Sequence, residues 1–180
     1  EIGRITAVQL GSPAEKEGLK AGDRITKVNG KAVGTDIDPL RLPDEFYKAA
    51  TTPGTHEIKV TYSRTVDGGA PEEKECHLVP QDMPPWLQRP DFPGDPIAIP
   101  AIGIAYRLVP TVLNIDEAGP AAGKVERGDL IKKLTLFLPE GAEPDHPEDN
   151  KNDIVFDFTE DDKSLAHAFW MMQLNPRRHV

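Results

Sequence analysis

A pattern of helix-capping and turn residues that occurs twice along the chain constrains its fold more than any other feature. Residues 12–30 read SPAEKEGLKAGDRITKVNG, and residues 119–134 read GPAAGKVERGDLIKKL. Both segments place Pro-Ala after a small residue, followed by a glycine, an apolar residue, Gly-Asp and an apolar stretch. Equivalent positions, such as Pro13 with Pro120 and Gly22 with Gly128, lie 106 or 107 residues apart. A repeat at this spacing predicts two similar domains of roughly 80 residues each.

The residues of the first copy predict a short helix, a strand and a hairpin. Ser12 can cap a helix that begins with Pro13, where the missing N–H of proline costs nothing. Gly18 can end that helix in a left-handed conformation. Asn29-Gly30 predicts a type I′ turn, which needs positive φ at both central residues. The second copy is expected to assign the same helix roles to Gly119, Pro120 and Gly123.

Hydrophobic periodicity and breaker residues predict the remaining elements. In the first domain we expect strands at 2–9 and 24–28, a helix within 39–50, and a hairpin of strands 56–64 and 73–79. In the second domain we expect strands at 102–108, 111–115, 130–138 and 154–158, and a helix over 161–174. Thr159 and Asp162 form a predicted capping box for that helix. Its expected apolar stripe contains Leu165, Ala168, Phe169 and Met172.

A proline-rich segment separates the two copies. Seven prolines occur among residues 80–100, which predicts an extended, semi-rigid connection. The expected boundaries are therefore residues 1–80 for the first domain, 81–96 for the linker and 97–180 for the second domain. The formal net charge of −9 argues against nucleic acid as a partner, because an acidic surface repels phosphate.

The pattern at residues 12–30 closely resembles the bacterial PDZ domain, and residues 119–134 resemble a diverged copy that lacks the Asn-Gly turn. The order of the elements is similar to the circularly permuted bacterial form. The resemblance implies a mixed α/β, mainly β fold, with two partly open barrel- or sandwich-like domains and two helices in each. Only residues 175–180 follow the last predicted helix, so the second domain is expected to lack its final strand.

In the PDZ family, a peptide adds as a strand beside the strand that follows the carboxylate-binding loop, next to the longer helix. The resemblance implies that this loop is formed in the first domain by Ile2, Gly3, Arg4 and Ile5, facing Phe46, Tyr47 and Ala50. In the second domain it implies a loop of Ala101, Ile102, Gly103 and Ile104, facing Leu165, Phe169 and Met172. The expected ligands are apolar C-terminal tails of peptides or proteins.

Paired PDZ domains with a proline-rich connection resemble those of membrane-embedded zinc proteases of the site-2 protease family. This resemblance implies an extracytoplasmic, periplasmic fragment that recognises tails or gates access to a zinc site in the parent protein. The partner would then be the protease domain of the parent chain. Two alternatives remain: a steric size filter that binds no tail, and the PDZ region of a periplasmic serine protease.

No catalytic or metal motif accompanies this pattern. The chain contains no His-Glu-x-x-His, Cys-x-x-Cys or Gly-x-Ser-x-Gly, so we expect no catalytic residue, metal or cofactor in it. Cys76 adjoins His77, but neighbours in a strand point to opposite faces, which favours a half-buried cysteine over a thiol–base pair. His167 is open to two interpretations, a groove residue or an ordinary helix-surface histidine. Residues 169–172 are likewise either core or a partner surface.

Overall fold

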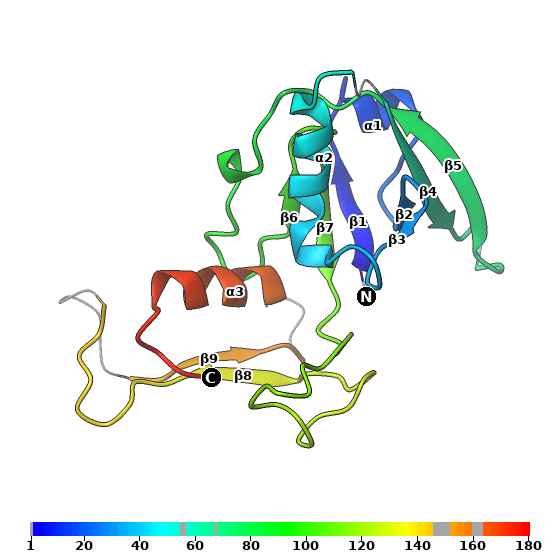
Figure 1. The fold of residues 1–180 in the computed structure, drawn as a ribbon. Coiled ribbons are helices and arrows are strands. Elements are labelled where there is room, and N and C mark those ends of the chain that lie inside the picture. Colours follow the sequence, from blue (N-terminus) through cyan, green and yellow to red (C-terminus); the bar gives the residue numbers. More distant parts are fainter. Residues whose placement is uncertain (1, 55–56, 67, 146–151, 160–163) are drawn as a thin grey trace. The chain divides into compact units, whose positions relative to one another are not determined.

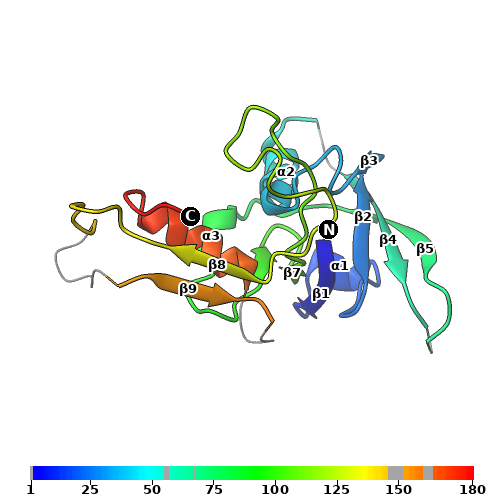
Figure 2. The same ribbon diagram turned by 90° about the horizontal axis from the view of Figure 1, so that it is seen from below.

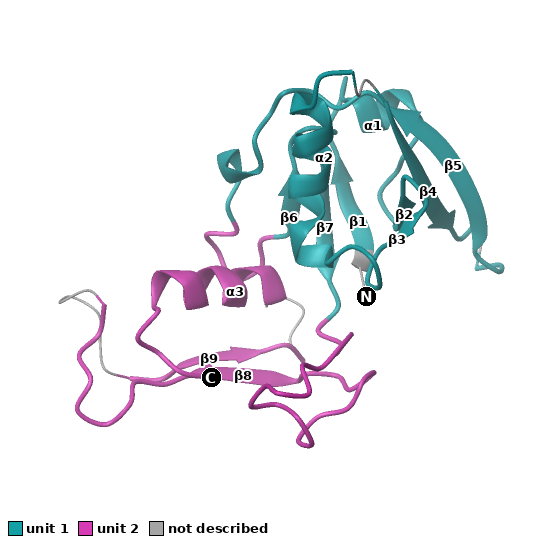
Figure 3. Ribbon diagram, in the orientation of Figure 1, with its two compact units in different colours: residues 1–89, 96–109 teal, residues 90–95, 110–180 magenta. Residues whose placement is uncertain are grey.

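The computed structural model of the chain describes residues 2–54, 57–66, 68–145, 152–159 and 164–180. These residues form two compact units (Figure 3). Unit 1 contains residues 1–89 and 96–109, and unit 2 contains residues 90–95 and 110–180. The division differs from the expected boundaries, because residues 97–109 belong to unit 1 and not to the second domain. The reason is a strand pairing between distant parts of the sequence, which local patterns do not reveal.

The first sheet of unit 1 is built from both ends of its sequence. Strand β1 (Ile2–Val8) pairs antiparallel with β7 (Ile104–Leu108), which also pairs antiparallel with β6 (Ile97–Ile99). The register sets Val8 opposite Ile104 and Ile97 opposite Tyr106. Strand β7 is thus the centre of a three-stranded sheet in the order β1-β7-β6, as Figure 1 shows.

The second sheet of unit 1 has the order β3-β2-β4-β5 (Figure 2). Its strands are β2 (Arg24–Val28), β3 (Lys31–Ala32), β4 (Ile58–Arg64) and β5 (Glu72–Leu78). Asn29 and Gly30 have φ values of 49° and 79°, so the predicted turn with two positive φ angles is confirmed. The predicted hairpin of the two longer strands is also confirmed, and Val60 lies opposite Cys76 in it.

The helices of unit 1 follow the sequence signals closely. Helix α1 (Pro13–Lys16) is capped by Ser12, whose side chain accepts a hydrogen bond from the Glu15 N–H. Gly18 has a φ of 78° just after this helix, as expected. A 3-10 turn η1 (Pro39–Arg41) leads into α2 (Leu42–Thr51), and a second turn η2 (Pro85–Leu87) contacts α2. The proline-rich segment is therefore packed along part of its length.

A buried ion pair stabilises the Gly-Asp turn of unit 1. Asp23 is 1 % exposed, and its two carboxylate oxygens accept hydrogen bonds from Arg64 Nε at 2.7 Å and Nη2 at 2.6 Å. The same carboxylate also accepts the Lys20 N–H at 2.8 Å. Arg64 in addition donates to the Gly18 carbonyl at 2.7 Å. A single arginine thus connects the end of β4 to the helix-and-turn motif.

Unit 2 is a two-stranded sheet covered on one face by a helix. Strands β8 (Lys133–Leu136) and β9 (Ile154–Asp157) pair antiparallel, and α3 (Leu165–Leu174) lies along them (Figures 1 and 2). Leu136, Phe156 and Ala168 are the buried residues of the unit's core. The architecture of the described chain is mainly β with few helices, which confirms the expected fold class.

The N-cap of α3 differs from the predicted one. Ser164 is the cap, and its hydroxyl accepts a hydrogen bond from the Ala166 N–H at 3.2 Å. Thr159 instead donates its hydroxyl to Asp157. The predicted capping box at Thr159 is therefore wrong, and its proposed partner Asp162 lies outside the described residues. A serine directly before the first helical residue can cap the helix by itself, which explains why α3 begins after Ser164 and not after Thr159.

The internal repeat reappears in the structure as one turn. In the first copy, the Asp23 carboxylate and carbonyl accept the N–H groups of Lys20 and Ile5 at 2.8 and 2.7 Å. In the second copy, Asp129 accepts those of Glu126 and Val112 at 2.8 and 2.9 Å. Gly22 and Gly128 have nearly equal φ values of 95° and 96°. The sequence repeat is thus a repeat of backbone conformation at this turn.

Two other predictions for the second copy are wrong. The segment with Gly119, Pro120 and Gly123 forms hydrogen-bonded turns and no helix, because only three residues separate two glycines and a helix nucleus is costly. The expected strand at 111–115 is reduced to an isolated bridge between Thr111 and Leu130. In unit 1 the corresponding strand β1 is extended by its pairing with β7.

Candidate functional site

The loop that joins β6 to β7 is fixed by main-chain hydrogen bonds from three other segments. Residues 100–103 form this loop, which we call the β6–β7 loop. The carbonyl of Ala101 accepts the Gln81 N–H at 2.7 Å, that of Ile102 accepts the Ala14 N–H at 3.1 Å, and that of Gly103 accepts the Gln9 N–H at 2.8 Å. The loop is therefore held against the start of α1 and against the residues that follow β5.

Gly103 is the one position in this loop where only glycine fits. Its φ is 73°, and a Cβ built there would lie 2.3 Å from Ser12 Cβ and 2.9 Å from Ser12 Oγ. The loop backbone thus passes directly against the N-cap of α1. This close approach joins the Ser-Pro-Ala motif of the sequence to the strand β7, about ninety residues later in the chain.

Strand β6 lies at the edge of the first sheet and contacts α2 (Figure 1). Ile97 is opposite Tyr106 and Ile99 is opposite Ile104, so both isoleucines share the face of β7 that carries the buried Tyr106 and Ile104. Ile99 is fully buried in the core of unit 1, and Ile97 packs against that core. Residues 97 and 99 therefore form the inward side of a short apolar strand next to α2.

The carbonyl of Ile99 accepts hydrogen bonds from the N–H groups of the β6–β7 loop. The Gly103 N–H donates to it at 2.9 Å and the Ile102 N–H at 3.2 Å. Loop N–H groups that converge on one oxygen form an anion- or carbonyl-binding concavity. The site thus combines an extended strand beside β7, a buried apolar side chain at its end, and an oxygen held by two loop N–H groups.

The structure places the predicted loop residues of the two domains in one unit. Ala101, Ile102 and Ile104 are buried in the core that also contains Ile5 and Phe46. The loop at 101–104 was expected to face Leu165, Phe169 and Met172, but those residues belong to unit 2, and α2 lies in the loop's own unit.

The first predicted loop is part of a strand. Residues Ile2, Gly3, Arg4 and Ile5 all belong to β1, whose pairing with β7 keeps this segment extended. Arg4 is exposed, whereas Ile5 is 2 % exposed. The N–H of Ile5 donates to Asp23, which is a role in the Gly-Asp turn. The prediction of a loop at residues 2–5 is therefore wrong.

Helix α2 carries the other predicted residues of unit 1. Phe46 is fully buried, while Tyr47 and Ala50 are half-buried. The Tyr47 ring meets the ring of Trp86 edge-on, with centroids 5.4 Å apart. Trp86 is itself 60 % exposed, so it can report on events at this helix.

The predicted residues of unit 2 lie along α3. Leu165, Phe169 and Met172 are half-buried, and Met172 packs against the unit's core. His167 is 8 % exposed, with its Nδ1 2.7 Å from the Pro90 carbonyl oxygen and its ring 5.9 Å from that of Phe156. It is thus a buried histidine, so the interpretation as an ordinary helix-surface residue is wrong.

Sequence reasoning missed the contribution of residues 97–99 to the site. These residues were expected to open the second domain. A signal was nonetheless present, because an alternating Ile-Ala-Ile is followed by Pro100 and by Gly103, which are turn residues, and then by another apolar run. This pattern is typical of a hairpin with a four-residue loop.

Comparison with known protein families supports one part of this assignment. Residues 4–41 match the family model of the PDZ domain. The match spans about a fifth of the chain and contains most of β1 and the whole of α1, β2, β3 and η1. A comparison with curated proteins found no match. PDZ domains are peptide- and protein-binding modules, so the matched part of the chain has the character of a protein-binding module.

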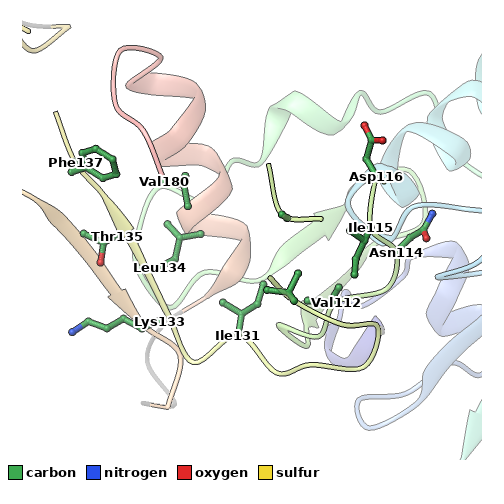
Figure 4. Close-up of a pocket in the computed structure, with 12 residues that line it drawn as sticks. Val112, Asn114, Ile115, Asp116, Ile131, Lys133, Leu134, Thr135, Phe137 and Val180 are labelled. Carbon is green, nitrogen blue, oxygen red and sulfur yellow. The ribbon is translucent and has the colours of Figure 1, made fainter. Parts of the chain in front are cut away.

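Unit 2 contains an apolar pocket of about 690 Å³ (Figure 4). Its lining comes from the segment 112–116, from Ala121 and Val125, from β8 and its flanks, and from Val180. Most of the lining side chains are aliphatic, with Asp116 and Lys133 among the polar ones. None of the residues that line the pocket belongs to unit 1, so the pocket is not part of the site formed by β6 and the β6–β7 loop.

The described residues hold neither a metal cluster nor a membrane helix. No group of three or more His, Cys, Asp or Glu side chains among them is arranged to hold a metal ion. None of the helices in the described ranges has the length and apolar character needed to cross a bilayer.

Cys76 is expected to be unreactive in the native protein. The residue is 7 % exposed on β5, and burial raises the pKa of its thiol to about 11. Because the thiolate is the reactive form, we expect a disulfide reagent at pH 8 to label the native chain far more slowly than the unfolded chain. Equally fast labelling of both forms would contradict this burial.

The same shift predicts a loss of stability in alkali. The unfolded chain releases the Cys76 proton near pH 9, whereas the folded chain holds it to about pH 11. The contribution of the protonated Cys76 thiol to the free energy of unfolding is therefore complete below pH 9. It is lost as the pH rises toward 11. Cys76→Ala should show a smaller decrease in unfolding free energy between these two pH values than the unsubstituted chain, measured by urea titration.

Proposed function

We propose that unit 1 is a peptide-binding module that takes an apolar tail as an added strand beside β7 and against α2. The observation that carries this proposal is the position of β6. It is an extended segment that runs antiparallel to β7 and ends at the loop whose N–H groups hold the Ile99 carbonyl. The antiparallel pairing of residues 97–99 with β7 supports the proposal, because addition of a strand is the binding mode that the PDZ match of residues 4–41 suggests.

The geometry of β6 defines the ligand that fits. Ile97 and Ile99 face inward and are two residues apart, so a tail should carry apolar side chains at its last and third-from-last positions. A terminal carboxylate would put a charged oxygen where the Ile99 carbonyl lies. Hydrogen bonds to an ionised acceptor are roughly twice as strong as those to a neutral one, which favours a free C-terminus over an internal segment.

We further propose that the module belongs to a membrane-embedded zinc metalloprotease of the site-2 protease family and acts outside the cytoplasm. Zinc would then be held by the protease domain of the parent protein, which would be the module's partner. The recurrence of the Gly-Asp turn at Asp129 and the proline-rich segment between the two copies support a paired arrangement of this kind. A periplasmic serine protease is the alternative parent.

A second candidate function is a steric filter that binds no tail. One observation favours the steric filter: β6 already fills the position beside β7 and against α2 where a tail would bind. In that case α2, β6 and β7 would form a closed wall. The two functions differ in whether a soluble peptide binds at all, so a titration separates them.

The test uses the hexapeptide Gly-Asp-Pro-Ile-Ala-Ile, which has the sequence of residues 94–99 and ends in a free carboxylate. We expect saturable binding to the 180-residue chain, followed by anisotropy of the labelled peptide and by tryptophan fluorescence, to which Trp86 and Trp170 both contribute. The amidated twin should bind at least about tenfold more weakly, since it lacks the charged oxygen. A peptide with serine at both isoleucine positions is the control for apolar recognition.

The Ile97→Ser variant completes this test, because it weakens β6 at a half-buried position. If the hexapeptide bound neither to the unsubstituted chain nor to the Ile97→Ser variant, the proposal would be overturned and the steric filter would remain. Equal affinities for the acid and the amide would show that the loop N–H groups do not recognise a carboxylate.

A further inference from the structure

We infer that the peptide groove of unit 1 is regulated by its own occupant. Strand β6 fills the place of the ligand, and an external tail binds only when β6 leaves the edge of β7. This inference rests on the proposed function of unit 1 and adds the regulation of that site. It predicts a protein that alternates between a closed state, with β6 in place, and an open state that accepts a tail.

The closed state is held by the same contacts that a tail would make. Strand β6 pairs with β7 over three residues, Ile99 is fully buried, and the Ile99 carbonyl accepts the N–H groups of Ile102 and Gly103. An incoming strand with an apolar last residue and a carboxylate reproduces each of them. The two occupants therefore compete for one set of hydrogen-bonding groups and one apolar position, and they cannot be bound together.

The rest of the groove does not depend on β6 for its position. Strand β7 also pairs antiparallel with β1, and β6 takes no part in that pairing. The carbonyls of the β6–β7 loop are held by Gln9, Ala14 and Gln81, none of which lies on β6. Release of β6 thus removes one edge strand and leaves the acceptor surface anchored on its other side.

Strand β6 has the features of a segment that can be released. It is only three residues long, it lies at the sheet edge, and Ile97 and Ala98 are half-buried. Short edge segments with few buried contacts belong to the low-stability part of a fold. Because an occupied site lowers the apparent affinity by the fraction of open molecules, any change that loosens β6 should tighten tail binding by the same factor.

The decisive experiment locks β6 to β7. Ala98 and Ala105 lie directly opposite each other in the two strands, so cysteines at both positions can form a cross-strand disulfide. We would introduce Ala98→Cys and Ala105→Cys together with Cys76→Val, which removes the native thiol. Binding of the free-carboxylate hexapeptide should fall at least about tenfold in the oxidised form and return on reduction.

A matched control places the same crosslink in the other sheet of unit 1. Lys59 and His77 are directly opposite on β4 and β5, and both are exposed. The variant Lys59→Cys, His77→Cys in the same Cys76→Val background should bind the hexapeptide equally well when oxidised and when reduced. The reduced forms of both variants also report whether the substitutions alone alter the fold.

A second variant acts in the opposite direction. Ile97→Ser removes an apolar side chain from β6, and we expect it to bind the hexapeptide about tenfold more tightly than the unsubstituted chain. Unchanged binding in the oxidised form of the Ala98→Cys, Ala105→Cys variant would overturn the inference while leaving peptide binding itself in place. Absence of binding in every chain, including Ile97→Ser, would instead overturn the proposed function together with this inference.

Discussion

Replacement of Arg64 by methionine is expected to lower the free energy of unfolding by about 3 kcal/mol. The substitution keeps most of the aliphatic volume but leaves the Asp23 carboxylate, 1 % exposed, without its two guanidinium hydrogen bonds. A buried charge that loses its partner retains the cost of desolvation without the compensating attraction. Chemical denaturation of a Trp170→Phe background, in which Trp86 is the remaining tryptophan, followed by fluorescence and by circular dichroism, would measure the loss.

The control for this prediction is an exposed ion pair in the same sheet. Lys59 Nζ lies 2.9 Å from Glu75 Oε1, and both side chains are about half exposed. Lys59→Met should cost less than about 1 kcal/mol, because solvent screens such pairs. Equal losses for Lys59→Met and Arg64→Met would contradict the structural role that we assign to the Asp23 carboxylate.

Replacement of Gly103 by alanine is expected to destabilise unit 1 by about 2–4 kcal/mol. A non-glycine residue at positive φ costs about 1–2 kcal/mol, and relief of the overlap with Ser12 requires a further shift of the loop or of α1. The same shift would move the Ile102 and Gly103 N–H groups. Reduced tail binding should therefore accompany the lower unfolding free energy.

Gly54 provides the matched control for Gly103. Its φ is 83°, but a Cβ there would meet no atom within 4 Å. Gly54→Ala should thus show only the backbone cost, about 1–2 kcal/mol. If both substitutions lowered the unfolding free energy equally, the close approach of the loop to the N-cap of α1 would not be a feature of the protein in solution.

Local chemistry made much of unit 1 predictable from the sequence. The Ser12 cap, the positive φ of Gly18 and the Asn29-Gly30 turn each depend on one or two residues, and the structure shows all three. The hairpin of β4 and β5 is similarly local, since a short connection fixes its register. Such features are read from side-chain hydrogen bonding and allowed backbone angles.

The pairing of β1 with β7 could not be predicted in this way. Its partners are about one hundred residues apart, and an apolar run such as residues 102–108 fits the sheet of either unit. The choice depends on packing that no local pattern encodes. As a result, Ala101, Ile102 and Ile104 were identified as a loop-and-strand segment but were assigned to the domain of α3, whereas they belong to unit 1 together with α2.

The second copy shows how a motif can persist without its full structure. Asp129 keeps the hydrogen bond to the N–H three residues before it, as Asp23 does, yet Asp129 is exposed. The turn depends on two residues and is therefore retained. The helix before it depends on a cap and a sufficient length, and the segment between Gly119 and Gly123 supplies neither.

The most direct test of the account is residue-resolved amide hydrogen exchange of the isotopically labelled chain, with and without saturating unlabelled hexapeptide. If a tail replaces β6, the amides of residues 97–99 that pair with β7 should lose protection in the complex. The amides of β7, Ile102 and Gly103 should remain protected, because the tail takes over their hydrogen bonds. Undiminished protection of residues 97–99 at saturation would contradict the claim that β6 occupies the ligand's place.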